Sequence, residues 1–199
     1  MTYGNLTLDQ LQRIHAIKND TDFDKRIEQY SIVYNKSIEF CGTLSLQTLY
    51  SKTAFLQSKI PDFNLKKRYG KFQPITNFIE LSLAQHKDIS YFMESNGNDW
   101  IKCAPQLLAV INKQMTITGY KYRPDKHQKN IERFRKSKCK NVLGAVFFYL
   151  NFTKNYSWIT KDYLEAEELI ASTMKTIQED SGFKTFIQDG LGKSELVPS

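Results

Sequence analysis

The sequence predicts a mainly α protein, a compact single-domain bundle of about seven or eight helices with one small β-hairpin at about residues 63–76. Apolar residues recur at helical spacing along most of the chain, behind Ser, Thr or Asp residues that can cap a helix. Hydrophobic residues at 41% and charged residues at 25% are globular values. No repeat or low-complexity linker interrupts the chain, so we expect one domain over residues 1–185 and a flexible tail over 186–199.

Three helices are predicted in the first 60 residues. The first begins after Thr7, whose hydroxyl can serve as its N-cap. The second, "DFDKRIEQYSIVY", is capped by one of residues 20–22 and has acids in its first turn, which suit the helix dipole. The third covers residues 43–60 and ends at Pro61, because proline cannot continue a helix.

The hairpin is predicted from the segment "FNLKKRYGKFQPIT". Gly70 and Lys71 lie between two short runs that contain aromatic residues. Glycine at the first loop position suits a two-residue turn, because that position requires a positive φ angle. Pro74 fits an edge strand, since it has no backbone N–H for a neighbouring strand.

The remaining elements are predicted to be helical, with one loop. Ser82 caps one helix, and Asn98 or Asp99 caps the next. Pro105 lies well inside that second helix, which therefore kinks there or gives way to a new helix. Residues 115–124 are interpreted as a loop. The helices after residue 80, apart from the basic segment described next, are predicted at 82–95, 98–113, 141–159 and 160–179.

The positive charge is concentrated in one segment. The whole chain has a formal net charge of +7, and residues 121–140, "KYRPDKHQKNIERFRKSKCK", carry nine Lys or Arg against two acids. The rest of the chain is therefore neutral as a whole. A local excess of this kind indicates a surface that meets something negatively charged.

An amphipathic basic helix is predicted from about Pro124 to Cys139. Ile131 and Phe134 fall on one side of it, and cations spaced by 3, 4 and 3 residues form a stripe on the other. Three interpretations stay open: a solvated face or an ionic contact with an acidic protein, non-specific contact with nucleic acid, and contact with a membrane surface. The predicted partner-binding or nucleic-acid-binding residues are Lys126, Lys129, Arg133, Arg135, Lys136 and Lys138.

The sequence offers few groups for catalysis. No phosphate-binding glycine loop, dinucleotide fingerprint, HExxH or GxSxG motif is present. Cys41 or Cys139 could be a nucleophile, and we expect the cations around Cys139 to lower its pKa. The acids Asp162, Glu165, Glu167 and Glu168 could pair on a helix, but acids in first turns more often favour the helix dipole. We expect no catalytic site, no metal and no cofactor.

The aromatic and apolar segments point to the interior of a protein. Trp100 and Trp158 are interpreted as core residues rather than interface anchors. The longest apolar run, "VLGAVFFYL", has about half the roughly 20 residues that span a bilayer. No secretory signal peptide is recognised, and the three scattered cysteines do not suggest a disulfide framework. We therefore expect no membrane-spanning helix and a cytosolic location.

The order of several segments is similar to that of a known family. In sequence, they are "LTLDQLQRIHAI", "DFDKRIEQYSIVYNKSIEFCGTLSLQTLYSKTAFLQSKIP", "KKRYGKFQPITNFIELSLAQHKDISYFM", "QLLAVI" and "VLGAVFFYLNF". This order resembles small proteins of tailed bacteriophages from Bacteroidetes-type hosts, described as tail assembly chaperones or morphogenesis proteins. The matching positions, within residues 7–165, are Phe55-Leu56, Gly70-Lys71, Gln85 to Asp88 and Phe147-Phe148. The chain departs from the family pattern in having Tyr69 before Gly70, and Ala84-Gln85-His86 where the family has Gly-Gln-Tyr.

The resemblance implies binding to other virion or tail proteins, without catalysis or cofactor. We therefore expect a non-enzymatic virion or tail morphogenesis protein, either a chaperone or a structural component, that acts through protein–protein contacts in the host cytoplasm or the virion. The basic stripe would dock an acidic phage structural protein. The alternative is a nucleic-acid-associated phage protein that contacts the DNA or RNA backbone through residues 121–140. The sequence does not define the oligomeric state.

Overall fold

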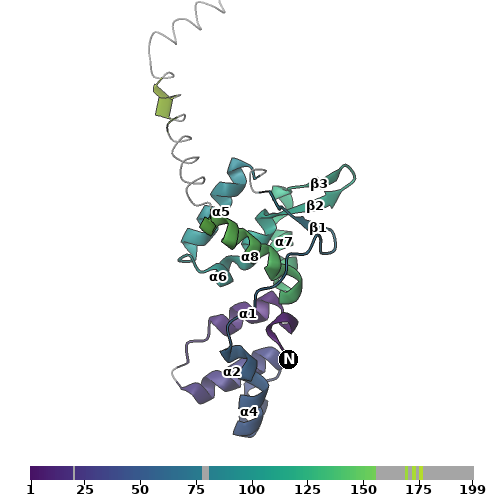
Figure 1. Ribbon diagram of the computed structural model, residues 1–199. Coiled ribbons are helices and arrows are strands. Elements are labelled where there is room, and N and C mark those ends of the chain that lie inside the picture. The colour runs from purple at the N-terminus through teal and green to yellow at the C-terminus, as the bar shows by residue number, and fades with distance from the viewer. Residues whose placement is uncertain (20, 78–80, 156–168, 170–171, 174, 177–199) are drawn as a thin grey trace, which may run out of the picture. The chain divides into compact units, whose positions relative to one another are not determined.

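The computed structural model describes residues 1–19, 21–77, 81–155, 169, 172–173 and 175–176 (Figure 1). These residues contain eight α-helices and a three-stranded antiparallel sheet, which confirms the prediction of a mainly α fold. The helices are α1 (Leu8–His15), α2 (Asp22–Tyr34), α3 (Ile38–Gly42), α4 (Leu46–Thr53), α5 (Leu83–Ser95), α6 (Trp100–Val110), α7 (His127–Arg135) and α8 (Cys139–Asn155).

The chain divides into two units, residues 1–150 and 151–199. The first unit holds α1 to α7, the sheet and most of α8. In the second unit the structure describes the last residues of α8 and five helical positions between 169 and 176. The predicted limits of the domain at residue 185 and of the tail at 186–199 lie outside the described residues, as does most of the helix predicted at 160–179.

Side-chain caps set the starts of several helices, as the sequence predicts. The Thr7 hydroxyl accepts a bond from the Gln10 N–H at 3.2 Å, and the Gln10 side chain accepts one from the Thr7 N–H at 2.9 Å. Ser82 and Gln85 form the same reciprocal capping box on α5. Asp99 caps α6, which continues through the buried Pro105. These caps satisfy backbone N–H groups that have no partner inside the helix.

Two predicted helices have different limits in the structure. The helix predicted at 43–60 begins at Leu46, after Ser45 as its N-cap, and residues 54–57 form a 3₁₀ turn. The basic helix predicted at about 124–139 consists of a 3₁₀ turn at 124–126 and then α7, which ends at Arg135. It ends there because the following backbone pairs with the N-terminal segment. Leu8 donates its N–H to the Ser137 carbonyl at 2.9 Å, and Cys139 donates to Leu6 at 2.8 Å.

The hairpin predicted at residues 63–76 is correct only in its turn: residues 63–68 form no strand, and β1 (Phe72–Pro74) pairs with a segment about 40 residues later. The order of the sheet is β1, β2 (Asn112–Thr116) and β3 (Gly119–Lys121). The turn at Gly70 is confirmed: Tyr69 and Phe72 exchange backbone hydrogen bonds of 2.9 and 3.1 Å, and Gly70 has a φ of +58°. The prediction of a loop at 115–124 is wrong, because much of that segment forms β2 and β3 with β1 as their partner.

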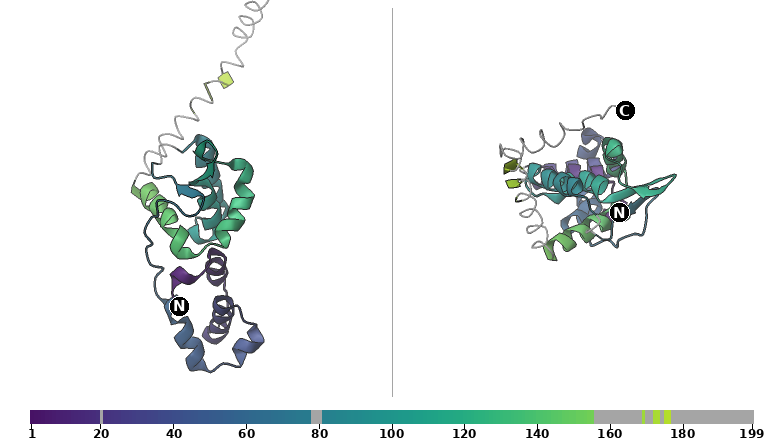
Figure 2. Two further views of the ribbon diagram at one scale, coloured as in Figure 1. Left: turned by 90° about the vertical axis from the view of Figure 1, so that its right-hand side faces the viewer. Right: turned by 90° about the horizontal axis from the view of Figure 1, so that it is seen from above.

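The β2–β3 hairpin projects from the helices of its unit (Figures 1 and 2). Ile117 at its tip is fully exposed, and Met115 on β2 is 55% exposed. The main core of the unit lies instead between α6, α7 and α8, where the fully buried side chains include Leu107, Leu108, Phe134, Val142, Leu143 and Val146. A smaller core in the N-terminal helices contains Ile27, Cys41 and Leu49.

Gly144, in the middle of α8, allows a close crossing of two backbones. A Cβ atom at this position would lie closer than 3.0 Å to backbone atoms of Asn64 and Leu65. Glycine costs about 1 kcal/mol relative to alanine inside a helix, and the crossing explains its presence here. The crossing also fixes where the chain enters the turn at residues 66–71.

We predict that Gly144→Ala destabilises the protein, although alanine favours helices. Overpacking of this kind typically costs about 1–3 kcal/mol, which exceeds the gain in helix propensity. Gly42→Ala is the matched control, because a Cβ there meets no atom within 4 Å. Chemical denaturation should show a lower free energy of unfolding for Gly144→Ala only. Equal or greater stability of Gly144→Ala would contradict the crossing.

Candidate anion-binding face

The helix α7 buries one side and exposes a cationic side. Ile131 and Phe134 are buried, at 7% and 1% exposure, as the amphipathic pattern predicts. Lys129 and Arg133 are exposed on the opposite side, and Lys126, just before the helix, is exposed as well. The structure therefore brings three of the six predicted binding residues to neighbouring positions on one surface.

A second basic segment reaches the same surface. It is "KKRYGK", residues 66–71, which follows the crossing at Gly144. The Lys66 ammonium donates a hydrogen bond of 2.7 Å to the Asn141 side chain on α8. The pKa of Lys71 is lowered by burial and then by repulsion from Arg133, Lys129 and Lys126, so these four charges lie within electrostatic reach. We define the basic face as Lys66, Lys71, Lys126, Lys129 and Arg133.

Most charges of the basic face have no acidic partner in the described part of the chain. Lys126 forms a long ion pair of 3.7 Å with Asp125. Within the described residues, Lys66, Lys71, Lys129 and Arg133 form no ion pair with an Asp or Glu. Like charges held together without counter-charges repel each other, and a bound anion would relieve that repulsion.

The other three predicted binding residues are placed differently. Arg135 forms an ion pair of 3.0 Å with Glu132 of its own helix. Lys136 is exposed at the C-terminal cap of α7, and Lys138 is exposed in a single β-bridge with Thr7. The structure therefore brings together Lys126, Lys129 and Arg133 with cations of the preceding segment. Arg135 is paired within its own helix, and Lys136 and Lys138 follow the end of α7.

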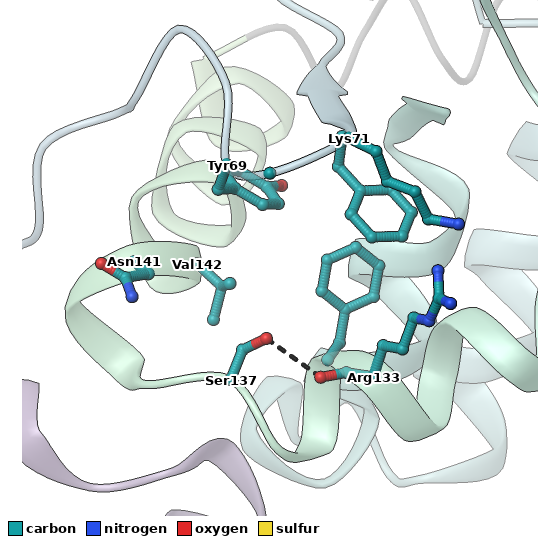
Figure 3. A pocket seen from close by; sticks show the side chains of 9 residues that line it. Tyr69, Lys71, Arg133, Ser137, Asn141 and Val142 are labelled. Carbon is teal, nitrogen blue, oxygen red and sulfur yellow. Dashed lines mark hydrogen bonds between the residues drawn. The ribbon is translucent and has the colours of Figure 1, made fainter. Parts of the chain in front are cut away.

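A pocket of about 360 Å³ opens beside the basic face. Figure 3 shows the charged ends of Lys71 and Arg133 near each other on one side of the opening, with Asn141 and Val142 on the other. The Phe72 and Phe134 rings, which pack with centroids 4.7 Å apart, form part of its wall. The lining residues are Tyr69, Gly70, Lys71, Phe72, Arg133, Phe134, Ser137, Asn141 and Val142.

The chemistry of the pocket suits binding. Its polar lining consists of two cations, a phenol, a hydroxyl and an amide, and it includes no Asp, Glu, His or Cys. The Ser137 hydroxyl donates to the Arg133 backbone carbonyl at 2.9 Å, and no base adjoins it in the lining. Its apolar residues Phe72, Phe134 and Val142 are buried, so the groups open to a ligand are mainly cations and neutral hydrogen-bonding groups, which suit an anion.

Hydrogen bonds hold the basic turn in place. The Tyr69 hydroxyl donates to the Asn112 side chain, and Asn112 donates to the Leu108 carbonyl at 2.6 Å. The Met115 N–H donates to the Lys71 carbonyl at 2.8 Å. Burial raises the pKa of Tyr69, so the phenol stays neutral. The turn is thus tied to α6 and β2, which fixes one side of the pocket.

Sequence reasoning missed Lys66 and Lys71, although the sequence contains a signal for them. The segment "KKRYGK" has four basic residues and no acid. Acids elsewhere in the chain balance it in the total, so the charge count outside residues 121–140 is zero. A local count would have shown a second basic segment, but only the fold shows that it adjoins α7.

The candidate nucleophiles do not lie in a reactive setting. Cys41 and Cys139 are both fully buried. Burial raises the pKa of Cys139 to about 12, so the expectation that neighbouring cations lower it is wrong. The flanking Lys138 and Lys140 point their charges into solvent, where they are screened.

The other candidates can be placed only in part. Trp100 packs edge-on against Phe147 with centroids 5.3 Å apart, but both side chains are half-buried, so Trp100 lies at the edge of the core rather than inside it. Trp158 and the acids at 162–168 lie outside the described residues. In the part of the chain that the structure describes, no group of three or more His, Cys, Asp or Glu could hold a metal ion. No helix in that part has the length and apolar character needed to cross a membrane.

No family model matches the chain, and neither a curated protein nor a solved structure matches it. The functional argument therefore depends on the geometry of the basic face and its pocket.

We predict that Tyr69→Phe lowers the free energy of unfolding by about 1–3 kcal/mol, because it leaves the buried Asn112 oxygen without its donor. Chemical denaturation measures the change. Tyr120→Phe is the control, since Tyr120 is partly exposed and has no side-chain hydrogen bond among the described residues. Equal free energies of unfolding for Tyr69→Phe and Tyr120→Phe would show that the Tyr69–Asn112 hydrogen bond does not stabilise the protein.

We predict that the thiols are inert in the folded protein. Cys41, Cys103 and Cys139 are fully buried, and burial raises the pKa of each. A thiol-reactive disulfide reagent at pH 8 should modify all three cysteines after denaturation and none rapidly before it. Rapid modification of one thiol in the folded state, lost in Cys139→Ala, would instead identify Cys139 as reactive.

Proposed function

We propose that this protein acts by binding, without catalytic turnover, and that the basic face docks onto a polyanionic partner. The single observation that carries this proposal is the convergence of cations from two separate segments, residues 66–71 and 126–133, with few acidic partners nearby. If the cations of α7 only kept that helix soluble, there would be no reason for the basic residues of segment 66–71 to lie beside them. Isolated surface charges normally alternate in sign, whereas a cluster of one sign creates a field that attracts an oppositely charged surface.

The setting that we propose is the assembly of a tailed-bacteriophage particle. This part of the proposal is supported by the order of segments that resembles phage tail assembly chaperones and morphogenesis proteins. The polyanionic partner would then be an acidic virion or tail protein, or the phage nucleic acid. Gene order tests the setting: a gene for a long coiled-coil tape-measure protein should lie beside the gene for this chain, and its absence from related phage genomes would count against a tail role.

We expect Lys71→Glu, Lys129→Glu and Arg133→Glu, combined, to weaken polyanion binding by on the order of tenfold or more, because each reversal replaces attraction with repulsion. Heparin chromatography measures this as elution at a lower salt concentration. The control combines Lys18→Glu, Lys36→Glu and Lys52→Glu, which are exposed and change the net charge equally.

The comparison separates a local site from an effect of total charge. The control variant should elute near the unmodified protein. If both triple variants elute equally early, net charge alone governs retention, and the basic face is not a binding site. Circular dichroism confirms that both variants are folded.

A further inference from the structure

We propose that the basic face binds the acidic segment at residues 162–168 of a second copy of this chain. This inference rests on the proposed function, because it names the polyanionic partner of the same surface. It is supported by the unpaired cations of the face, by the distribution of charge along the chain, and by the length of chain that follows α8.

The cations of the basic face can accept several acidic side chains at once. Lys129 and Arg133 are exposed and lie one helical turn apart on α7. Their charges, after burial, lower the pKa of Lys71, so the three groups lie close enough to repel one another. Within the described residues none of the three forms an ion pair. Carboxylates brought to this surface would relieve the repulsion.

The acidic charge of the chain is concentrated beyond α8. Residues 156–199 contain eight Asp or Glu and four Lys or Arg, a net charge of −4, so residues 1–155 carry +11. The segment "DYLEAEE", residues 162–168, has four acids and no Lys or Arg, and no other seven-residue window of the sequence has as many acids. One chain therefore contains both halves of an ionic contact, a dense cationic surface and a dense anionic segment.

The length of the chain after α8 favours a second copy over the same chain. The Asn141 side chain accepts a hydrogen bond from Lys66 of the basic face, and α8 continues from there to Asn155. A helix rises about 1.5 Å per residue, so a predicted helix at 160–179 that folded back along α8 would carry residues 162–168 beside only the second half of α8. The acids would then stop about 9 Å or more short of Asn141. A second copy has no such limit, because its segment can approach the face from outside.

Two copies can make the contact twice. Each copy has one basic face and one acidic segment, so a reciprocal exchange closes a pair with two-fold symmetry. An exposed ion pair changes an affinity by a factor of only about 1.5 to 5. Once the first contact has formed, however, the second takes place within one complex, and the two together hold more tightly than either alone.

Sedimentation velocity with the full chain tests the proposal. The measurements are made at about 0.1 M and about 1 M salt, where the Debye length is about 10 Å and about 3 Å. We expect the unmodified protein to sediment as an associated species at the lower salt concentration and as a monomer at the higher one.

Two charge-reversed variants identify the contacting surfaces. The face variant carries Lys71→Glu with Arg133→Glu, and the segment variant carries Glu165→Lys with Glu168→Lys. Each alone should self-associate about tenfold or more weakly, because like charges then meet. An equimolar mixture of the two should associate again, because the reversed face of one variant is complementary to the reversed segment of the other.

A control variant separates the segment from the effect of net charge. Asp62→Lys with Glu94→Lys reverses two exposed acids elsewhere in the chain, and it should associate as the unmodified protein does. Circular dichroism confirms that each variant is folded.

The inference fails if the unmodified protein is monomeric at the lower salt concentration, or if the mixture of face and segment variants stays monomeric. It also fails if the control variant loses association as fully as the segment variant. The heparin experiment decides the proposed function separately: if retention still depends on Lys71, Lys129 and Arg133, the basic face remains a polyanion-binding surface and only the second copy is lost as its partner.

Discussion

The close crossing of residues 64–65 over α8 at Gly144 is the constraint on which the basic face depends. Without a side chain at that position, the backbone can approach the helix and continue directly into the basic turn. The Tyr69–Asn112 hydrogen bond and the backbone bond from Met115 to Lys71 then hold the turn against α6 and β2. The basic face, which combines residues 66–71 with α7, therefore depends on a glycine in α8.

Local signals in the sequence were sufficient for much of the helical structure. Thr7, Ser82 and Asp99 cap their helices because capping needs only atoms within a few residues. The sheet could not be predicted in the same way, because β2 pairs with β1 about 40 residues earlier. Whether residues 112–121 form a strand or a loop depends on that partner, and periodicity contains no information about it.

The candidate site likewise combines features that nearby residues predict with features that depend on distant parts of the chain. The amphipathic pattern of α7 identified Lys126, Lys129 and Arg133 as one cationic side, and it correctly buried Ile131 and Phe134. The pattern could not show that the helix ends at Arg135, since residues 6–8 compete for the backbone that follows. Nor could it show the pocket, because a pocket arises from the packing of the turn, α7 and α8 together.

The pairing of residues 6–8 with residues 137–139 joins segments about 130 positions apart. During synthesis on a ribosome, the beginning of α1 emerges long before its backbone partners exist. The N-terminal segment must therefore wait, with Leu6 and Leu8 unprotected, until residues 137–139 have been made. Closure of this long loop carries an entropic cost, so we expect the docking of residues 6–8 to be a late step in the folding of this unit.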